Sequence, residues 1–139
     1  MRKNPQGYYT NRHSCFLLQY HLVLVTKYRR PVISDEVREW LINYTKEYFK
    51  KQDCILIEVN TQPDHIHILF EAPPQINLAN FVNAFKSASS RMIRNLFQEQ
   101  VSRFYWKPYF WSLSYFLCTV SERTAEAVMK YIQNQDNNE

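Results

Sequence analysis

Residues 64–70 read Asp-His-Ile-His-Ile-Leu-Phe, an alternation that predicts a β-strand. Successive strand residues point to opposite faces, so His65 and His67 share one face while Ile66 and Ile68 point toward a core. Neutral imidazole is one of the commonest metal ligands in proteins. The pair is therefore a candidate metal site, although this spacing alone is equally compatible with a structural or incidental role.

Periodicity predicts the elements around this strand. Apolar, branched and aromatic runs predict strands at residues 16–26, 54–59, 65–70 and 109–120, after a polar start through about residue 12. Helical spacing predicts helices at 35–51, capped by Ser34, at 78–96, and from Ser121 or Glu122 onward. The order βαββαβα predicts an α+β fold with a ferredoxin-like, RRM-like antiparallel sheet covered by helices and an added C-terminal helix. Residues 1–139 are expected to form a single domain.

Composition narrows the function classes. Gly7 is the only glycine, so no glycine-rich phosphate loop exists and a nucleotide cofactor is not expected. The net charge of +4 modestly favours a polyanionic partner, but an ordinary basic surface explains it comparably well. Three cysteines without CxxC spacing predict neither a zinc site nor a disulfide framework. With no signal-like or membrane-spanning apolar run, a cytoplasmic protein without membrane association is expected.

The predicted C-terminal helix carries a second candidate group. Tyr131 and Gln135 are four residues apart and therefore share one helical face. Val128 and Ile132 flank that face, so this helix alone favours a packing role for the tyrosine. Two imidazoles and the Gln135 carboxamide oxygen would give a divalent metal three ligands with open positions, and Tyr131 would supply a nucleophile.

These motifs resemble those of a known family, the single-tyrosine HUH transposases (TnpA) of bacterial insertion sequences of the 200/605 type. His65-Ile66-His67 matches the family's histidine pair on a central strand, Tyr131 its nucleophile on a C-terminal helix, and Gln135 its last metal ligand. The resemblance extends over residues 20–31, 85–91 and 106–111. The order also fits, because in relaxases of the wider HUH group the tyrosine precedes the histidines.

The resemblance implies a transposase that cleaves and rejoins single-stranded DNA through a 5′-phosphotyrosine intermediate, with Mg²⁺ or Mn²⁺ as cofactor. It also implies binding of hairpin ends and a homodimer whose active sites combine residues of both subunits. A domesticated or inactive hairpin-binding module of the same fold is the alternative, together with a plain ferredoxin-like RNA binder. The family usually has glycine where this chain has Ser87 and Ser121, and the second position precedes the final helix.

Other residues receive more local interpretations. Asp64 is either an outer-shell partner of the metal site or a turn residue, with both readings open. His21, Trp40 and Trp111 are interpreted as core residues. Basic residues of the turn after the first strand and of the second helix are expected to bind DNA, and three aromatic side chains are possible stacking partners for bases. The basic candidates are Lys27, Arg29, Arg30, Lys86 and Arg91, and the aromatic ones are Tyr28, Phe104 and Tyr105.

Overall fold

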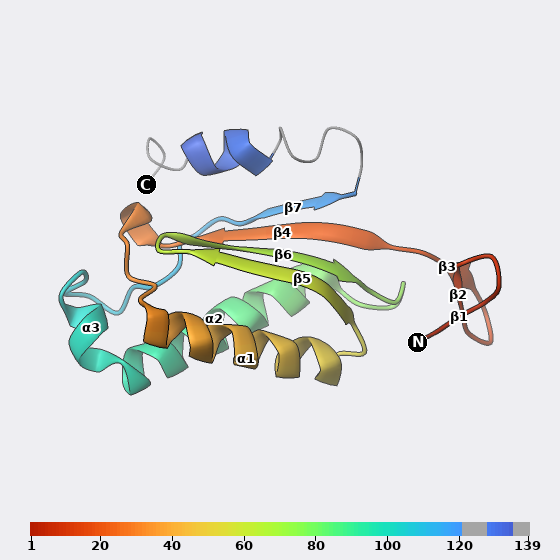
Figure 1. The fold of residues 1–139 in the computed structure, drawn as a ribbon, viewed down its shortest axis with the longest axis horizontal. Coiled ribbons are helices and arrows are strands. Elements are labelled where there is room, and N and C mark those ends of the chain that lie inside the picture. Colours follow the sequence, from red (N-terminus) through yellow and green to blue (C-terminus); the bar gives the residue numbers. More distant parts are fainter. Residues whose placement is uncertain (121–127, 135–139) are drawn as a thin grey trace.

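The structure is a computed structural model that describes residues 1–120 and 128–134, and its centre is a four-stranded antiparallel sheet. The sheet order is β5-β6-β4-β7, as labelled in Figure 1. The strands are β4 (Gln19–Val25), β5 (Ile55–Gln62), β6 (His65–Glu71) and β7 (Phe116–Thr119). The predicted α+β, ferredoxin-like class is confirmed, with the histidine-bearing strand β6 inside the sheet rather than at its edge.

Helices cover both faces of the sheet (Figure 1). On one face lie α1 (Asp35–Lys51) and α2 (Leu78–Leu96), and a helical segment at 128–134 lies on the other. Both long helices begin where the sequence predicts. The Ser34 hydroxyl accepts a hydrogen bond from the Val37 amide at 3.3 Å, and the Asn77 side chain caps α2.

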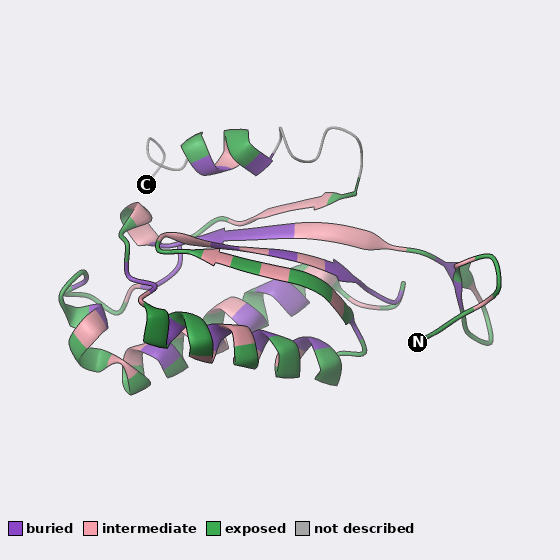
Figure 2. Ribbon diagram, viewed as in Figure 1, coloured by how far each residue is buried: buried purple, intermediate pink, exposed green. Residues whose placement is uncertain are grey.

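The main core lies between the sheet and the α1–α2 layer. Ile66 and Ile68 are fully buried there, as the strand alternation predicts. Phe49 of α1 packs edge-to-face on Phe70 of β6, with ring centroids 5.0 Å apart. On the opposite face, a small cluster consists of Val23, Val25, Val128 and Ile132. In Figure 2 the helix at 128–134 turns its buried side toward the sheet and its exposed side outward.

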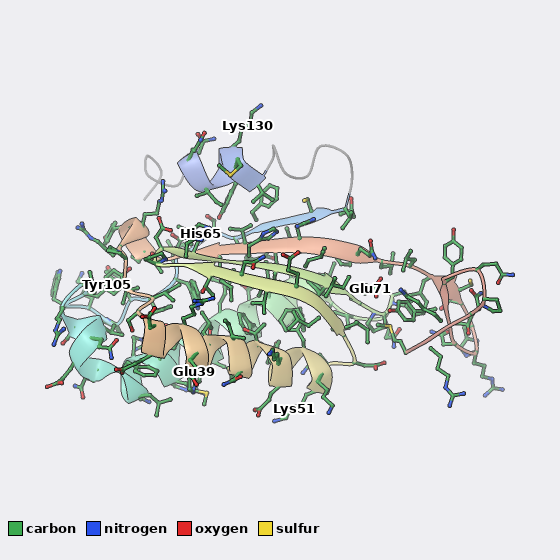
Figure 3. All side chains as sticks on the ribbon, in the orientation of Figure 1. Glu39, Lys51, His65, Glu71, Tyr105 and Lys130 are labelled. Carbon is green, nitrogen blue, oxygen red and sulfur yellow. The ribbon has the colours of Figure 1, made fainter. Side chains whose placement is uncertain are left out.

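The first predicted strand is in fact two strands in different sheets. Residues Cys15–Phe16 form β3, which joins β1 (Arg2–Lys3) and β2 (Tyr9–Thr10) in a small separate sheet. The Tyr9 hydroxyl donates to the carboxylate of Glu71, and Gln19 Nε2 donates to the other oxygen at 2.7 Å. The Tyr9 bond ties the small sheet to the end of β6, near the Glu71 label in Figure 3. Two-residue strands are too short to show alternation in sequence.

Three further predictions need correction or a limit. The strand predicted at 109–120 is reduced to β7 and an isolated β-bridge between Trp111 and Thr26, and the Trp111 indole donates to Ser89 Oγ at 3.0 Å. Trp111 is buried as predicted, whereas Trp40 is only partly buried at the edge of the core. The sequence did not predict α3 (Gln98–Ser102), and the predicted start of the final helix lies outside the described residues. Among the helices that the structure describes, none has the length and apolar character needed to cross a membrane.

Candidate metal and nucleophile site

Strand register determines which face carries the two histidines. His67 pairs with Val23 of β4, and His65 pairs with Val25. Directly opposed residues in an antiparallel pair project to the same face. Val23 and Val25 pack against the helix at 128–134, so both imidazoles project toward the face that this helix covers. The sheet therefore presents His65 and His67 on the same side as the segment that contains Tyr131.

The His65 ring is fixed by the residue before it. Its Nδ1 lies 2.8 Å from Asp64 Oδ1, and Asp64 Oδ2 accepts a hydrogen bond from Arg29 Nε at 2.7 Å. Burial raises the pKa of Asp64, but the hydrogen bonds from Arg29 and His65 outweigh it and hold that pKa below its ordinary value. With Nδ1 engaged, Nε2 of His65 is the ring nitrogen left for a ligand. Asp64 thus belongs to the β5–β6 turn and is also a hydrogen-bond partner of His65.

His67 contacts a third histidine. His21 Nδ1 lies 2.6 Å from His67 Nε2, and the two rings stack with centroids 4.9 Å apart. The prediction of His21 as a core residue is wrong, because it is only partly buried and is absent from the main core. Burial lowers the pKa of both imidazoles, and the nearby His21 lowers that of His67 further. Both rings therefore favour the neutral form, which is the form that binds metals.

The Tyr131 side chain contacts the β7 side of the sheet. Its ring packs on Phe116 of β7, with centroids 5.2 Å apart, and its oxygen lies 3.1 Å from Ser114 Oγ. Strand β4 lies between β7 and β6, so two strand spacings, about 10 Å, separate the backbone of Phe116 from that of His67. The tyrosine ring thus packs on β7, two strands away from the strand that carries His65 and His67.

The third predicted metal ligand, Gln135, lies outside the described residues. Within residues 1–120 and 128–134, no group of three or more histidine, cysteine, aspartate or glutamate side chains is arranged to hold a metal ion. The described part of the site thus consists of the imidazole pair and its hydrogen-bond partners. Figure 3 labels His65 beside the β5–β6 turn, at the opposite end of β6 from Glu71.

The basic residues predicted to bind DNA have different surroundings. Arg30 and Arg91 are exposed, whereas the Arg29 side chain is only 27% exposed because it lies against Asp64. Lys27 Nζ lies near the faces of two tyrosine rings, and Lys86 Nζ donates to the Leu113 carbonyl at 2.8 Å. The structure thus exposes Arg30 and Arg91, while Arg29 and Lys86 make bonds within the chain.

The three aromatic candidates also differ in their exposure to solvent. Tyr28 and Phe104 are 46% and 38% exposed, which fits a surface on which a base can stack. The prediction is wrong for Tyr105, which is buried and donates its hydroxyl proton to the Lys27 carbonyl at 2.5 Å. Tyr105 therefore packs inside the molecule and bonds to the basic turn instead of facing solvent. Figure 3 labels it near α3.

Sequence reasoning missed two residues at this site. His21, Val23 and Val25 are spaced two residues apart on β4, so strand alternation alone could have placed His21 on the same face as the two valines. Its contact with His67 depends on the β4–β6 register, which the sequence does not specify. Ser114, the partner of the Tyr131 hydroxyl, lies in an irregular segment before β7 and carries no pattern that would identify it.

The chain is similar in sequence to known proteins over most of its length. Residues 14–135 match the family model described as IS200-like transposase. The chain is 34% identical over 124 residues to the ISDra2 transposase TnpA of Deinococcus radiodurans, covering 89% of this chain and 88% of that protein. It is 29% identical over 123 residues to the transposase for insertion sequence element IS200 of Salmonella typhimurium, covering 88% and 80% of the two chains.

Solved structures agree in fold. A crystal structure of a Deinococcus radiodurans protein assigned as a transposase superposes with a TM-score of 0.84 at 34% identity, covering 91% of this chain and 97% of that one. A REP-associated tyrosine transposase bound to a REP hairpin superposes with a TM-score of 0.51 at 8% identity, covering 91% and 72%, and shares the fold alone. From the family match across residues 14–135, the chain belongs to the IS200-like transposases, enzymes that cut and transfer DNA.

Proposed function

We propose that this transposase cleaves and rejoins single-stranded DNA at insertion-sequence ends by metal-dependent transesterification, with Tyr131 as the nucleophile. The observation that carries the proposal is the placement of His65 and His67 on the sheet face covered by the helix of Tyr131. An imidazole pair on a rigid strand is suited to bind a metal, and a tyrosine on a separate element is suited to attack a bound phosphodiester.

The residues present fit a divalent metal. The Asp64 carboxylate engages Nδ1 of His65, an arrangement typical of metal-binding histidines, and burial favours neutral His67. His65 and His67 would hold Mg²⁺ or Mn²⁺ together with Gln135. When bound, the cation supplies Lewis-acid stabilisation of charge on the phosphate oxygens. Mixed nitrogen and oxygen ligands suit Mn²⁺ better than Mg²⁺, which prefers oxygen alone.

The covalent chemistry belongs to Tyr131. Its phenolic oxygen attacks phosphorus and loses its proton, the new P–O bond forms, and the bond from phosphorus to the 3′ oxygen breaks. The 3′ oxygen leaves as a hydroxyl after taking up a proton, and the 5′ end stays on the tyrosine. A 3′-hydroxyl attacking the phosphotyrosine reverses the step and joins a new DNA end. Since the phosphodiester is conserved, no nucleotide cofactor is required.

The position of the tyrosine oxygen supports a homodimer with shared sites. The contacts of Tyr131 with Phe116 and Ser114 hold the nucleophile across β4 from the histidines of the same chain. In a pair of subunits related by a two-fold axis, the histidines of one subunit would meet the tyrosine of the other. Each active site would then be composite.

DNA binding would use the exposed basic side chains. Arg30 and Arg91 present guanidinium groups to solvent, and Lys27 stands beside the exposed ring of Tyr28. Phosphate contacts from such residues position DNA without reading its sequence, while exposed aromatic rings stack on unpaired bases. The REP-associated relative is bound to a hairpin, and we extend that class of ligand, a folded single strand, to this chain.

A covalent-adduct assay tests the proposal. The full chain is incubated with labelled single-stranded hairpin DNA and MnCl₂ or MgCl₂, and a denaturing gel separates free DNA from protein-linked DNA. We expect the wild type and Tyr8→Phe, a control at an exposed tyrosine of the N-terminal segment, to form the adduct. Tyr131→Phe should form none. Hairpin binding by a wild type that forms no adduct, or equal adduct with Tyr131→Phe, would favour the non-catalytic hairpin-binding module instead.

A further inference from the structure

We propose that Arg29 is a positioning residue that couples His65 to the helix carrying Tyr131, and that it is not a DNA contact. The inference rests on the proposed metal site, whose ligand it would orient. It reassigns one of the basic residues that the sequence places among the DNA-binding candidates. The structure supports it through three contacts, through burial and through the backbone of the turn.

The first two contacts link Arg29 to the histidine pair. Arg29 Nε donates to Asp64 Oδ2 at 2.7 Å, and Asp64 Oδ1 lies 2.8 Å from Nδ1 of His65. One carboxylate thus holds a guanidinium on one oxygen and an imidazole on the other. Fixing the carboxylate fixes the ring plane of His65 and the direction in which its Nε2 points.

The third contact reaches the helix that carries Tyr131 in the same chain. Arg29 Nη1 donates to the main-chain carbonyl of Ile132 at 3.4 Å. Ile132 is the neighbour of Tyr131 and is buried against the sheet. A planar guanidinium presents several donors in a fixed arrangement, so one arginine can serve the carboxylate and the carbonyl together. The contacts therefore form a continuous path from the His65 imidazole to the helix of the nucleophile.

Burial separates Arg29 from its neighbour Arg30. The Arg29 side chain is 27% exposed and Asp64 is 20% exposed, so this ion pair is largely shielded from water. Arg30, the next residue, is exposed. A residue that binds phosphate mainly through charge needs its guanidinium in solvent, which Arg30 provides. Adjacent arginines thus face in different directions, one into the site and one outward.

The backbone of the turn is shaped to direct Arg29 inward. Arg29 has φ +54° and the preceding Tyr28 has φ +56°, both in the left-handed region that non-glycine residues rarely adopt. The Thr26 hydroxyl fastens this turn to the histidine strand, since it lies 2.7 Å from the Arg30 carbonyl and 3.1 Å from that of Asp64. Strained conformations of this kind persist where surrounding bonds impose them.

The experiment compares Arg29→Ala with Arg30→Ala in the full chain without DNA. MnCl₂ affinity is measured by titration calorimetry and by the electron paramagnetic resonance signal of free Mn²⁺. Amide hydrogen exchange is followed for residues 128–134. We expect Arg29→Ala to bind Mn²⁺ about tenfold more weakly, at the lower end of outer-shell effects, and to exchange several-fold faster in that helix. Arg30→Ala should leave both unchanged while weakening hairpin binding.

One additional variant and the wild-type titration keep the test decisive. Arg29→Lys retains a charge beside Asp64 but lacks the planar fork, so its Mn²⁺ affinity should lie between those of the wild type and Arg29→Ala. It also serves if Arg29→Ala does not fold. If Arg29→Ala matches Arg30→Ala in Mn²⁺ affinity, or in exchange at 128–134, the coupling is refuted. If the wild type itself binds no Mn²⁺, the proposed function fails first, and the failure is visible before any Arg29 variant is compared.

Discussion

The two faces of the central sheet differ in how firmly they hold what lies on them. On one face, Phe49 makes edge-to-face contacts with Phe70, Phe81 and Phe85 inside a core that unites sheet, α1 and α2. On the other face, the described helix at 128–134 contributes Val128 and Ile132 to the small cluster, and Tyr131 packs against it. Burying one such side chain is worth roughly 1.5–3 kcal/mol. The described part of this helix could thus be released at far less cost than unfolding the domain.

The two halves of the proposed site are therefore held in different ways. The histidines stand on β6, the strand between β5 and β4, and are tied to neighbouring side chains by Asp64 and His21. Tyr131 stands on the lightly held helix, with its oxygen at Ser114. If the proposed site is shared between subunits, it needs a firmly held histidine pair and a separable tyrosine.

The largest expected effect comes from mixing two inactive variants. Tyr131→Phe and His67→Ala should each form no covalent adduct alone. If tyrosine and histidines come from different subunits, half of randomly mixed dimers contain one complete site, so adduct formation should return to about one quarter of the wild-type level. The measurement is the denaturing-gel assay after the two proteins are unfolded together and refolded.

The same mixture distinguishes the opposite arrangement. If each chain supplied its own histidines and tyrosine, every mixed dimer would contain one site lacking its tyrosine and one lacking a histidine. No adduct would then return at any mixing ratio. Mixing Tyr131→Phe with Tyr131→Phe carrying Tyr8→Phe is the matched negative control. Absence of recovery would therefore overturn the shared site while leaving the family assignment intact.

A core substitution on each face should separate their contributions to stability. Phe49→Ala removes a fully buried ring and should lower the free energy of unfolding by about 3–5 kcal/mol. Ile132→Ala should instead accelerate hydrogen exchange within 128–134 and shift the global urea midpoint much less, because this helix can open by itself. Equal losses of global stability from the two substitutions would mean that both faces unfold as one unit.

Much of the fold was predictable from sequence because long periodic segments carry it. The helical spacing of Val37, Leu41 and Tyr48 predicted α1, and Ser34 marked its start. The separate sheet of β1, β2 and β3 was not predictable, since two-residue strands have no period and depend on the distant Glu71. The strand expected at 109–120 is shorter because only Trp111 and residues 116–119 pair with β4 or the residue after it, and local propensity does not encode that tertiary pairing.

The site was predictable to the extent that it is local. His65 and His67 lie two residues apart, so strand alternation placed them together. His21 and Arg29 reach the site only through the pairing of β4 with β6 and through the fold of a strained turn. Neither feature leaves a sequence pattern, because register and left-handed backbone angles at non-glycine residues are imposed by the rest of the molecule.

A moderate effect is expected from acid in the metal-free protein. Burial, and then the charge of His21, lowers the pKa of His67 below its ordinary value of 6.5, although Glu58 opposes the shift. The unfolded chain therefore binds the proton more readily, so stability should be complete above pH 6.5 and should fall as the pH drops below it. Urea unfolding at pH 7 and pH 5.5 with EDTA measures this loss. The pKa of Asp64 is lowered from 3.8, so its contribution declines only at pH values below this window.

The matched variants for that measurement are His67→Gln and His13→Gln. His67→Gln should reduce the loss of stability between pH 7 and pH 5.5, whereas the exposed His13 is remote from the pair and its replacement should not. A wild type whose stability is unchanged over this interval would show that the imidazoles on the helix-covered face are not held neutral by the fold. The two faces of the sheet would then differ in packing but not in the protonation of their side chains.

The smallest expected effect concerns the third histidine. His67 Nε2 cannot hold a metal and the 2.6 Å contact with His21 Nδ1 at the same time. His21→Phe keeps a ring to stack on His67 but removes that nitrogen, so Mn²⁺ affinity should increase, by at most about fivefold for a hydrogen bond of ~1 kcal/mol. Calorimetric titration with MnCl₂ measures the change, with His13→Phe as control. Weaker binding by His21→Phe would instead place His21 among the metal ligands, because loss of a competitor can only strengthen binding while loss of a ligand must weaken it.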